Sequence, residues 1–307
     1  MRDSLKKYGI TILGGDHRQV MVAESMIDHV AWVKTYGLLG VPNLPHLFPA
    51  ANLEEAIAGS RVIILPISGV DSKGLVRVSD PAVTIKINQE FWQQVTAGTL
   101  IVTGSFPLQL KTEAVQKGVK IFEYAEINEI AIPNAIPTAE GAIQLAMEKT
   151  SFTIDGSCCL VFGFGRVAQA LAKRLSALKA TIIIAARSNE QLRRAADLGY
   201  TPLHLSSLAE EINKTDLIFN TIPALIVTEE IVEKIKPETV IIDLASAPGG
   251  VDFQAAGKYG LTAILALGLP GKVAPLTAGK ILATQLPGLI KQEISYQNME
   301  NSLEVLR

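Results

Sequence analysis

The residues best suited to chemistry lie in a glycine turn at the middle of the chain. An apolar run, Cys158–Phe162, leads into Gly163-Phe164-Gly165-Arg166-Val167-Ala168, and leucines at helical spacing follow. A strand, a glycine turn and a helix in this order can bind a dinucleotide, because bare backbone and the helix N-terminus approach its pyrophosphate. We therefore expect redox chemistry with a nicotinamide or flavin cofactor. The expected cofactor-binding residues are Gly163, Phe164, Gly165, Arg166 and Val167.

The end of the next strand predicts which cofactor is preferred. An apolar run at Thr181–Ala185 is followed by Ala186-Arg187-Ser188. NAD-binding proteins place an acidic residue here, where it binds the ribose 2′-hydroxyl. Arg187 can instead bind a 2′-phosphate, and Ser188 can donate a hydrogen bond to it, so the sequence favours NADP over NAD. The alternative is that Arg187 is a solvated arginine at the start of a helix.

A third cofactor contact is expected where the predicted strand at 216–220 ends. Open α/β sheets bind ligands outside the carboxyl ends of their strands. The residues at this strand end are expected to touch the nicotinamide ribose and the face of the ring. They are Asn220, Thr221, Ile222 and Pro223.

A dense polar cluster, Asp16-His17-Arg18, follows the first predicted strand, Ile10–Leu13. Arg18 is suited to gripping a substrate carboxylate with its planar fork. His17 is suited to moving a proton near neutral pH, and Asp16 could orient it. The alternative is a helix N-terminus at which Asp16 is the cap and the other two side chains face water.

Further hydroxyls and amides occur at other strand ends. Ser68, Gly69 and Ser105 could bind a carboxylate or could be plain turns. Lys272 lies in the segment Gly268–Gly279, which we expect to be a loop, and it is either a second anion ligand or a solvated lysine. No group of His, Cys, Asp and Glu has metal-ligand spacing, so we expect no metal.

The pattern of apolar runs predicts the elements that position these residues. Strands are expected at 10–13, 61–65, 100–103, 119–122, 158–162, 181–185, near 203, 216–220, 240–243 and 262–265. Helices are expected from 20 to 27, 53–57, 139–149, after 165, at 189–198, 207–212, after 228 and at 280–302. Alternating strands and helices predict parallel sheets and an α/β fold.

We divide the chain into a smaller N-terminal α/β domain on the substrate side, residues 1–137, and a doubly wound Rossmann-type domain, residues 138–279. Pro133 and Pro137 interrupt the pattern between them, and Thr138 is expected to cap the helix that follows. The predicted C-terminal helix, within residues 280–307, is expected to return to the first domain. The two helices would then form a hinge.

Composition excludes several classes of protein. The chain has 307 residues, 48% hydrophobic residues and a net charge of −2, so there is no electrostatic case for nucleic acid or an anionic membrane. No apolar run approaches the ~18 residues that span a bilayer, and no cleavage-site pattern follows the N-terminus. The adjacent pair Cys158 and Cys159 is expected in a buried strand, as in a protein of the reducing cytoplasm.

Four motifs together resemble the family of dipicolinate synthase A subunits. They are Gly14-Gly15-Asp16-His17-Arg18-Gln19, Leu65-Pro66-Ile67-Ser68-Gly69, the glycine turn at 163–168, and Gly268-Leu269-Pro270-Gly271-Lys272-Val273-Ala274-Pro275. The glycine turn is shared widely, whereas the combination is fairly specific and spans nearly the whole chain.

The resemblance implies NADP-linked oxidation of dihydrodipicolinate, a small dicarboxylate at a branch of the lysine pathway, to dipicolinate during sporulation. It also implies a flavoprotein-like partner, the B subunit of dipicolinate synthase, and a location in the cytoplasm of the mother cell. Two alternatives stay open: another NADP-dependent dehydrogenase of small acids, of the shikimate or methylene-folate type, and a non-catalytic cofactor-binding subunit. Homo-oligomerisation also stays open.

Overall fold

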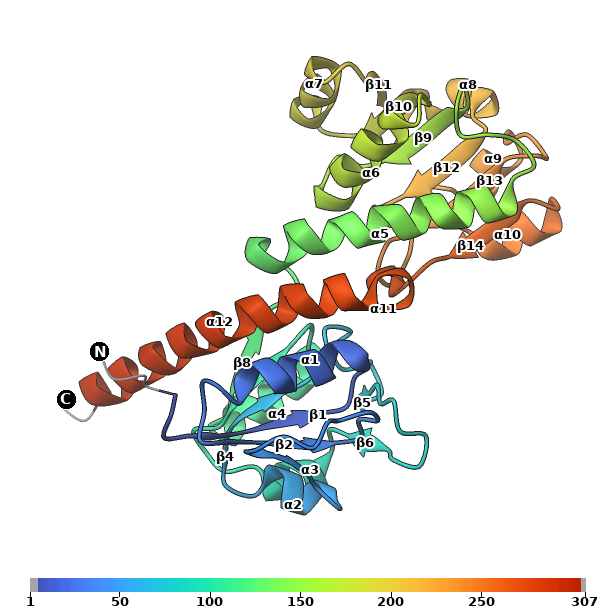
Figure 1. Ribbon diagram of the computed structural model, residues 1–307. Coiled ribbons are helices and arrows are strands. Elements are labelled where there is room, and N and C mark those ends of the chain that lie inside the picture. The colour runs from blue at the N-terminus through green and yellow to red at the C-terminus, as the bar shows by residue number, and fades with distance from the viewer. Residues whose placement is uncertain (1–4, 305–307) are drawn as a thin grey trace. The chain divides into compact units, whose positions relative to one another are not determined.

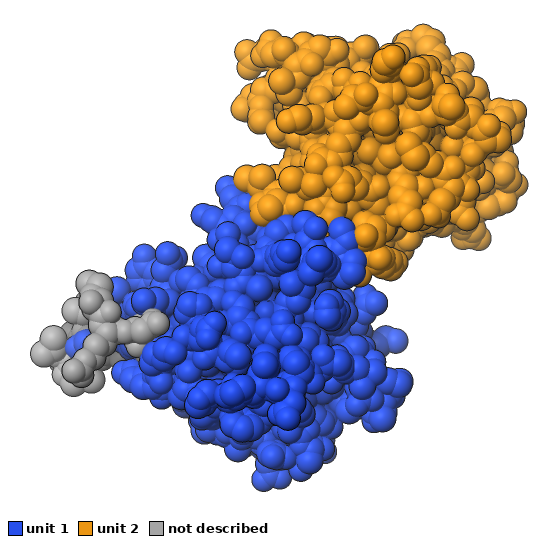
Figure 2. Space-filling model, viewed as in Figure 1, with its two compact units in different colours: residues 1–131, 274–307 blue, residues 132–273 orange. Residues whose placement is uncertain are grey.

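The computed structural model describes residues 5–304, apart from the side chains of residues 301, 303 and 304. The chain forms two compact units (Figure 2). Unit 1 contains residues 1–131 and 274–307, and unit 2 contains residues 132–273. Each unit is built on its own parallel sheet of six strands, which confirms the predicted α/β fold class.

The sheet of unit 1 has the order β3-β2-β1-β4-β7-β8, and Figure 1 labels its strands β1, β2, β4 and β8. Its strands are β1 (Gly9–Leu13), β2 (Trp32–Tyr36), β3 (Leu47–Pro49), β4 (Ser60–Ile64), β7 (Leu100–Thr103) and β8 (Lys120–Glu123). Between β4 and β7, β5 (Leu75–Val76) and β6 (Ile85–Lys86) pair antiparallel. The helices are α1 (His17–Met26), α2 (Leu53–Ile57), α3 (Gln89–Gln94), α4 (Leu108–Gln116) and α12 (Pro275–Glu304).

Two apolar layers cover the faces of this sheet. Val22 and Met26 of α1 pack with Leu282 and Leu286 of α12 over one face. The other face packs against α2, α3 and α4. Both faces are therefore buried at the centre of the sheet, which explains why the central strands β1, β4 and β7 are largely apolar.

The sheet of unit 2 has the order β11-β10-β9-β12-β13-β14. Its strands are β9 (Cys158–Phe162), β10 (Thr181–Ala186), β11 (Thr201–His204), β12 (Leu217–Asn220), β13 (Val240–Asp243) and β14 (Thr262–Leu265). The helices are α5 (Asn128–Lys149), α6 (Arg166–Ala177), α7 (Asn189–Asp197), α8 (Leu208–Glu211), α9 (Glu229–Val232), α10 (Phe253–Lys258) and α11 (Leu269–Val273), and 3₁₀ turns η1 (Leu205–Ser207) and η2 (Ile212–Lys214) flank α8. Helices α5 and α6 pack on one face of the sheet, and α8, α9 and α10 on the other.

Most predicted strands agree with the structure within a residue or two. The predicted start of the helix at 139–149 is wrong, because Pro133 and Pro137 were expected to precede the helix. Helix α5 begins at Asn128, and Pro133 and Pro137 lie inside it. The two prolines are four residues apart, so the backbone donors that they remove lie on one side of the helix. Thr138 is therefore not an N-cap. Its hydroxyl donates to the Asn134 carbonyl at 2.9 Å, one turn back.

The segment Gly268–Gly279 is also not a loop, because α11 begins at Leu269 and α12 begins at Pro275. Proline suits the first position of a helix, since the amide hydrogen it lacks has no partner there. The sequence analysis also missed β2, β3 and the β5–β6 pair, which are short or carry polar residues between the apolar ones.

Helices α1 and α12 are in close contact. A Cβ placed on Gly279 of α12 would lie 2.3 Å from the Met21 sulfur and 3.3 Å from the Arg18 Cα. The hydroxyl of Ser25 donates to the Ala283 carbonyl at 2.7 Å. The backbone of α12 thus supports the first turns of α1, where the polar cluster begins.

A matched pair of substitutions tests this contact. Alanine at an exposed helix position adds up to about 1 kcal/mol relative to glycine. We expect this gain for Gly288→Ala, since nothing lies within 4 Å of a Cβ there. Gly279→Ala must displace Met21, so its free energy of unfolding in urea should be about 1 kcal/mol or more below that of Gly288→Ala. Equal stabilisation by both substitutions would contradict the contact.

Candidate active site

The strand order places the same two loops side by side in each sheet. In chain order, both sheets run 3-2-1-4-5-6, so the direction of winding reverses between β1 and β4 and between β9 and β12. Ligands of such sheets bind at this switch point, outside the carboxyl ends of the strands. In unit 2, a Cβ on Gly163 would lie 2.9 Å from the Thr221 hydroxyl and 3.1 Å from Ile222 Cγ1. The two expected cofactor loops are therefore in contact.

The glycine turn of unit 2 has the geometry of a pyrophosphate cradle. Gly163 has a φ of +84°, which favours glycine. Gly165 is the N-cap of α6 and makes no side-chain cap bond. A Cβ on Gly165 would meet nothing within 4 Å, so the space in front of the helix is open. The backbone N–H groups of the first turn and the positive end of the helix dipole can therefore bind a dinucleotide phosphate.

Two expected cofactor ligands point into the protein instead. Phe164 is buried, and its ring meets Tyr200 edge-on at 6.1 Å between centroids. Only its backbone can face a cofactor. Asn220 is also fully buried, with its Nδ2 donating to the Ile222 carbonyl at 2.9 Å and to Asp243 Oδ1 at 2.8 Å. The side chain of Asn220 thus positions the loop after β12 through bonds within the protein.

Asp243 is a residue that the sequence analysis missed. Besides Asn220, its carboxylate accepts hydrogen bonds from the backbone of Ala245 at 3.0 Å and of Gly250 at 2.8 Å. These bonds hold the loop after β13 against the loop after β12. A buried carboxylate is costly unless it is fully hydrogen-bonded, and here the donors are backbone and amide groups. The position of Asp243 at the end of a buried apolar strand could have identified it as a residue of the ligand-binding edge.

Arg187 and Ser188 lie where the sequence places them, after β10. Arg187 is exposed. Ser188 is the N-cap of α7, and its hydroxyl oxygen accepts from the Gln191 backbone at 3.4 Å. The hydroxyl hydrogen of Ser188 is not used in that bond, so it can still be donated.

In unit 1, Asp16 binds Arg18 rather than His17. Asp16 caps α1 by accepting from the Arg18 backbone at 3.1 Å. Its two carboxylate oxygens also accept from Arg18 Nε at 2.8 Å and Nη2 at 2.7 Å. His17 is the exposed first residue of the helix. The cap of the alternative is thus observed and His17 faces water, but Arg18 does not, because its side chain is buried and paired with Asp16.

Electrostatics at this helix start favour an anion. Burial opposes ionisation of Asp16, but the hydrogen bonds and charge of Arg18, with the charge of Arg77, hold the pKa of Asp16 below its usual range. Arg77 lies just after β5, and its carbonyl accepts from the Gly15 backbone at 2.6 Å. Arg18 pairs with the carboxylate and the charge of the exposed Arg77 acts on it as well, so two positive charges face one negative charge here. Neither the sequence spacing nor the motif pointed to Arg77.

The other predicted substrate-binding residues of unit 1, in the loops after β4 and β7, lie next to one another. A Cβ on Gly69 would lie 2.3 Å from the hydroxyl and carbonyl oxygens of Ser105, and the Val70 backbone donates to that carbonyl at 3.1 Å. Ser68 and Gly69 also line a cavity of about 400 Å³, with Arg77 among its other lining residues. Beneath these loops, the fully buried Tyr124 donates to the Leu65 carbonyl at 3.0 Å, and burial raises its pKa.

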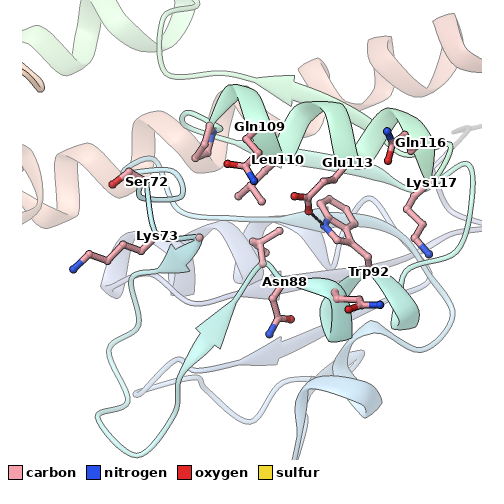
Figure 3. A pocket seen from close by; sticks show the side chains of 13 residues that line it. Ser72, Lys73, Asn88, Trp92, Gln109, Leu110, Glu113, Gln116 and Lys117 are labelled. Carbon is pink, nitrogen blue, oxygen red and sulfur yellow. Dashed lines mark hydrogen bonds between the residues drawn. The ribbon is translucent and has the colours of Figure 1, made fainter.

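A second cavity of unit 1, about 480 Å³, lies between α3, α4 and the turn at 72–74 (Figure 3). Trp92 Nε1 donates to Glu113 Oε2 at 2.8 Å across it. None of the predicted site residues lines this cavity. Lys272 belongs to unit 2, where it lies on α11.

The described part of the chain offers neither a metal site nor a membrane span. Among residues 5–304, no cluster of three or more His, Cys, Asp or Glu side chains could hold a metal ion. No helix in the same range is long and apolar enough to cross a membrane.

Comparison with known proteins agrees with this architecture. Residues 9–125 match the family model of the N-terminal domain of the dipicolinate synthase A subunit. Residues 137–252 match that of the NAD-binding domain of D-isomer specific 2-hydroxyacid dehydrogenases. The chain is 37% identical over 288 residues to the dipicolinate synthase A subunit of Bacillus subtilis (strain 168), covering 92% of this chain and 96% of the relative.

Solved structures show the same relationship. The chain superposes on the dipicolinate synthase A subunit from Bacillus halodurans with a TM-score of 0.87 and 34% identity, covering 93% of this chain and 99% of that one. A transhydrogenase from Sinorhizobium meliloti shares the fold alone, with a TM-score of 0.65 and 14% identity over 92% of each chain.

The fold and the glycine cradle define a nicotinamide-dinucleotide-binding protein of the dehydrogenase type, and hence an oxidoreductase. Within that class, the identity and coverage are decisive. The chain belongs to the family of dipicolinate synthase A subunits, which confirms the resemblance found in its motifs.

Substitutions of Asp16 test its double role as cap and ion-pair partner. We expect Asp16→Ala to lower the free energy of unfolding by about 1–2 kcal/mol, since both the cap and the pair are lost. Asp16→Asn keeps a good cap and should recover about half of that loss. Because its folded pKa is depressed, the contribution of Asp16 is present above the ordinary aspartate pKa and is lost as the pH falls through the folded value. Identical stabilities of the two variants would contradict the cap.

Proposed function

We propose that this chain catalyses the NADP-linked oxidation of dihydrodipicolinate to dipicolinate, pyridine-2,6-dicarboxylate. Membership of the family of dipicolinate synthase A subunits supports the substrate. The observation that carries the redox assignment is the open N-terminus of α6 at the switch point of unit 2. Arg187 follows β10, at the position where NAD-binding proteins carry an acidic residue, and this supports NADP over NAD.

The residues of unit 1 supply the binding of a dicarboxylate. Asp16 holds the guanidinium of Arg18 through Nε and Nη2, which leaves the Nη1 side to grip a substrate carboxylate. Ser68 and Ser105 offer hydroxyl donors at the neighbouring strand ends, and Gly69 holds the turn after β4 through its N–H bond to the Pro66 carbonyl. Lys272 is proposed as a further anion ligand. Unit 1 thus orients the ring, and ordered positioning lowers the barrier to transfer.

The reaction removes one hydride and one proton from the dihydropyridine ring, which becomes aromatic. When bound, NADP⁺ supplies the hydride acceptor. We assign the proton to His17, which is exposed at the start of α1 and can accept it directly or through water. Because Asp16 does not engage its ring, His17 depends on the helix start alone for its position.

The family name also implies a second subunit. We propose that the chain works with the B subunit in the cytoplasm of a sporulating mother cell. The test is to mix the purified chain with NADP⁺ and freshly generated dihydrodipicolinate, and to follow NADPH absorbance with and without that partner. A rise with the chain alone supports the proposal, and a rise only with both proteins makes the activity dependent on the partner. Binding of NADP⁺ without turnover in either case contradicts the proposal.

Replacement of Arg187 tests the cofactor preference. Losing a charge-assisted bond to the 2′-phosphate costs about 1.5–3 kcal/mol, so Arg187→Ala should weaken NADP⁺ binding about 10- to 100-fold with little change for NAD⁺. Calorimetric titration with each cofactor measures both. Arg193→Ala removes the same charge from an exposed position on α7 and serves as the control. Equal losses for the two cofactors, or for the two variants, would refute a contact with the 2′-phosphate.

A further inference from the structure

Gln19 has a buried side chain whose amide is unused. It lies in the first turn of α1 with 1% of its surface exposed. Neither its Nε2 nor its Oε1 has a hydrogen-bond partner among the described residues. Burying a polar group without a hydrogen-bond partner destabilises the folded chain. An apolar side chain of similar size would avoid this destabilisation. The presence of an amide therefore suggests a hydrogen-bond partner that is not part of the chain.

The position of Gln19 is fixed by the loops at the switch point of unit 1. A Cβ on Gly15 would lie 2.2 Å from Gln19 Cγ and 3.4 Å from Pro66 Cβ. The side chain of Gln19 therefore packs against Gly15, at the point where the loops after β1 and β4 meet. Gly15 has a φ of +105° and donates its N–H to the Arg77 carbonyl. The glycine thus leaves the room that the glutamine occupies.

The polar groups nearest in the chain are already committed. The backbone N–H of Gln19 donates to the Asp16 carbonyl at 2.8 Å. Both carboxylate oxygens of Asp16 are bound to Arg18, and the Tyr124 hydroxyl donates to Leu65. Each of these groups thus already has a partner, and none of them bonds the Gln19 amide.

We infer that the Gln19 amide donates a hydrogen bond to a carboxylate of the bound substrate, next to the carboxylate grip of Arg18. This inference rests on the proposed function. A carboxylate only accepts hydrogen bonds, and the amide nitrogen of glutamine offers two donors without adding charge. A glutamate of the same size would repel both the substrate and Asp16. Gln19 is thus a specificity-determining residue for a carboxylate, and the rival is a structural role in which the amide binds a buried water.

The test is Gln19→Leu, which removes both polar atoms at similar volume. Binding of pyridine-2,6-dicarboxylate is measured by calorimetry, together with KM, kcat, NADP⁺ binding and the melting temperature. We expect about tenfold weaker dicarboxylate binding and a similar rise in KM, at unchanged kcat and NADP⁺ affinity. The melting temperature should stay level or rise, because an unsatisfied amide has been removed.

Gln94→Leu is the matched control, since Gln94 also has a buried Oε1 without a partner among the described residues but lies on α3. It should leave dicarboxylate binding unchanged. Gln19→Glu is the second variant. It keeps the side-chain length and should weaken dicarboxylate binding at least as much as leucine does, even if the leucine variant folds poorly.

Four results would overturn the inference. A lower melting temperature for Gln19→Leu with unchanged dicarboxylate affinity would assign the amide to a structural water. Equal effects of Gln19→Leu and Gln94→Leu on binding would make the change nonspecific. Failure of the wild-type chain to bind the dicarboxylate would overturn the proposed function as well, whereas binding that Arg18→Ala abolishes and Gln19→Leu does not would overturn the inference on Gln19 alone.

Discussion

The parallel order of both sheets is the constraint on which the candidate site depends. Since all six strands of each sheet point the same way, every connection after a strand emerges at one edge. The reversal of winding between the first and fourth strands then leaves their two loops without a helix between them. In unit 2 these loops are the glycine turn and Asn220–Pro223, and in unit 1 they are Gly14–Asp16 and Pro66–Gly69. Chemically different residues thus occupy equivalent places in two sheets of the same topology.

Each unit stabilises its loops with one carboxylate, used in different ways. In unit 2, Asp243 is fully buried and accepts hydrogen bonds from Asn220 and from two backbone groups. Its carboxylate therefore holds the two loops in place. In unit 1, Asp16 is partly exposed and binds the side of Arg18, so it orients a cation that keeps further donors. The first arrangement suits a rigid cofactor cradle. The second suits a site that must recognise a charged substrate.

Sequence reasoning succeeded where the chemistry is local. The glycine turn is specified by consecutive residues, so Gly163, Gly165 and the small Ala168 could be assigned before the structure was known. It failed where a distant partner decides. Asp16 binds Arg18 and not His17. Asn220 donates to Asp243, which is 23 residues away in sequence. The prolines at 133 and 137 are unfavourable in an isolated helix, but α5 packs Ala139, Ala142 and Ala146 into the core, and such tertiary packing supplies most of a helix's stability. The motif at 14–19 includes Gln19, but sequence reasoning assigned this residue no role, because only the structure reveals that its amide is buried and unpartnered.

The most direct test of the account is a crystal structure of the chain with NADP⁺ and pyridine-2,6-dicarboxylate. The account predicts the pyrophosphate at the N-terminus of α6, the 2′-phosphate beside Arg187 and one carboxylate on the Nη1 side of Arg18. A dicarboxylate bound away from Arg18, for example in the cavity beside Trp92 and Glu113, with the loops after β1 and β4 unoccupied, would contradict it.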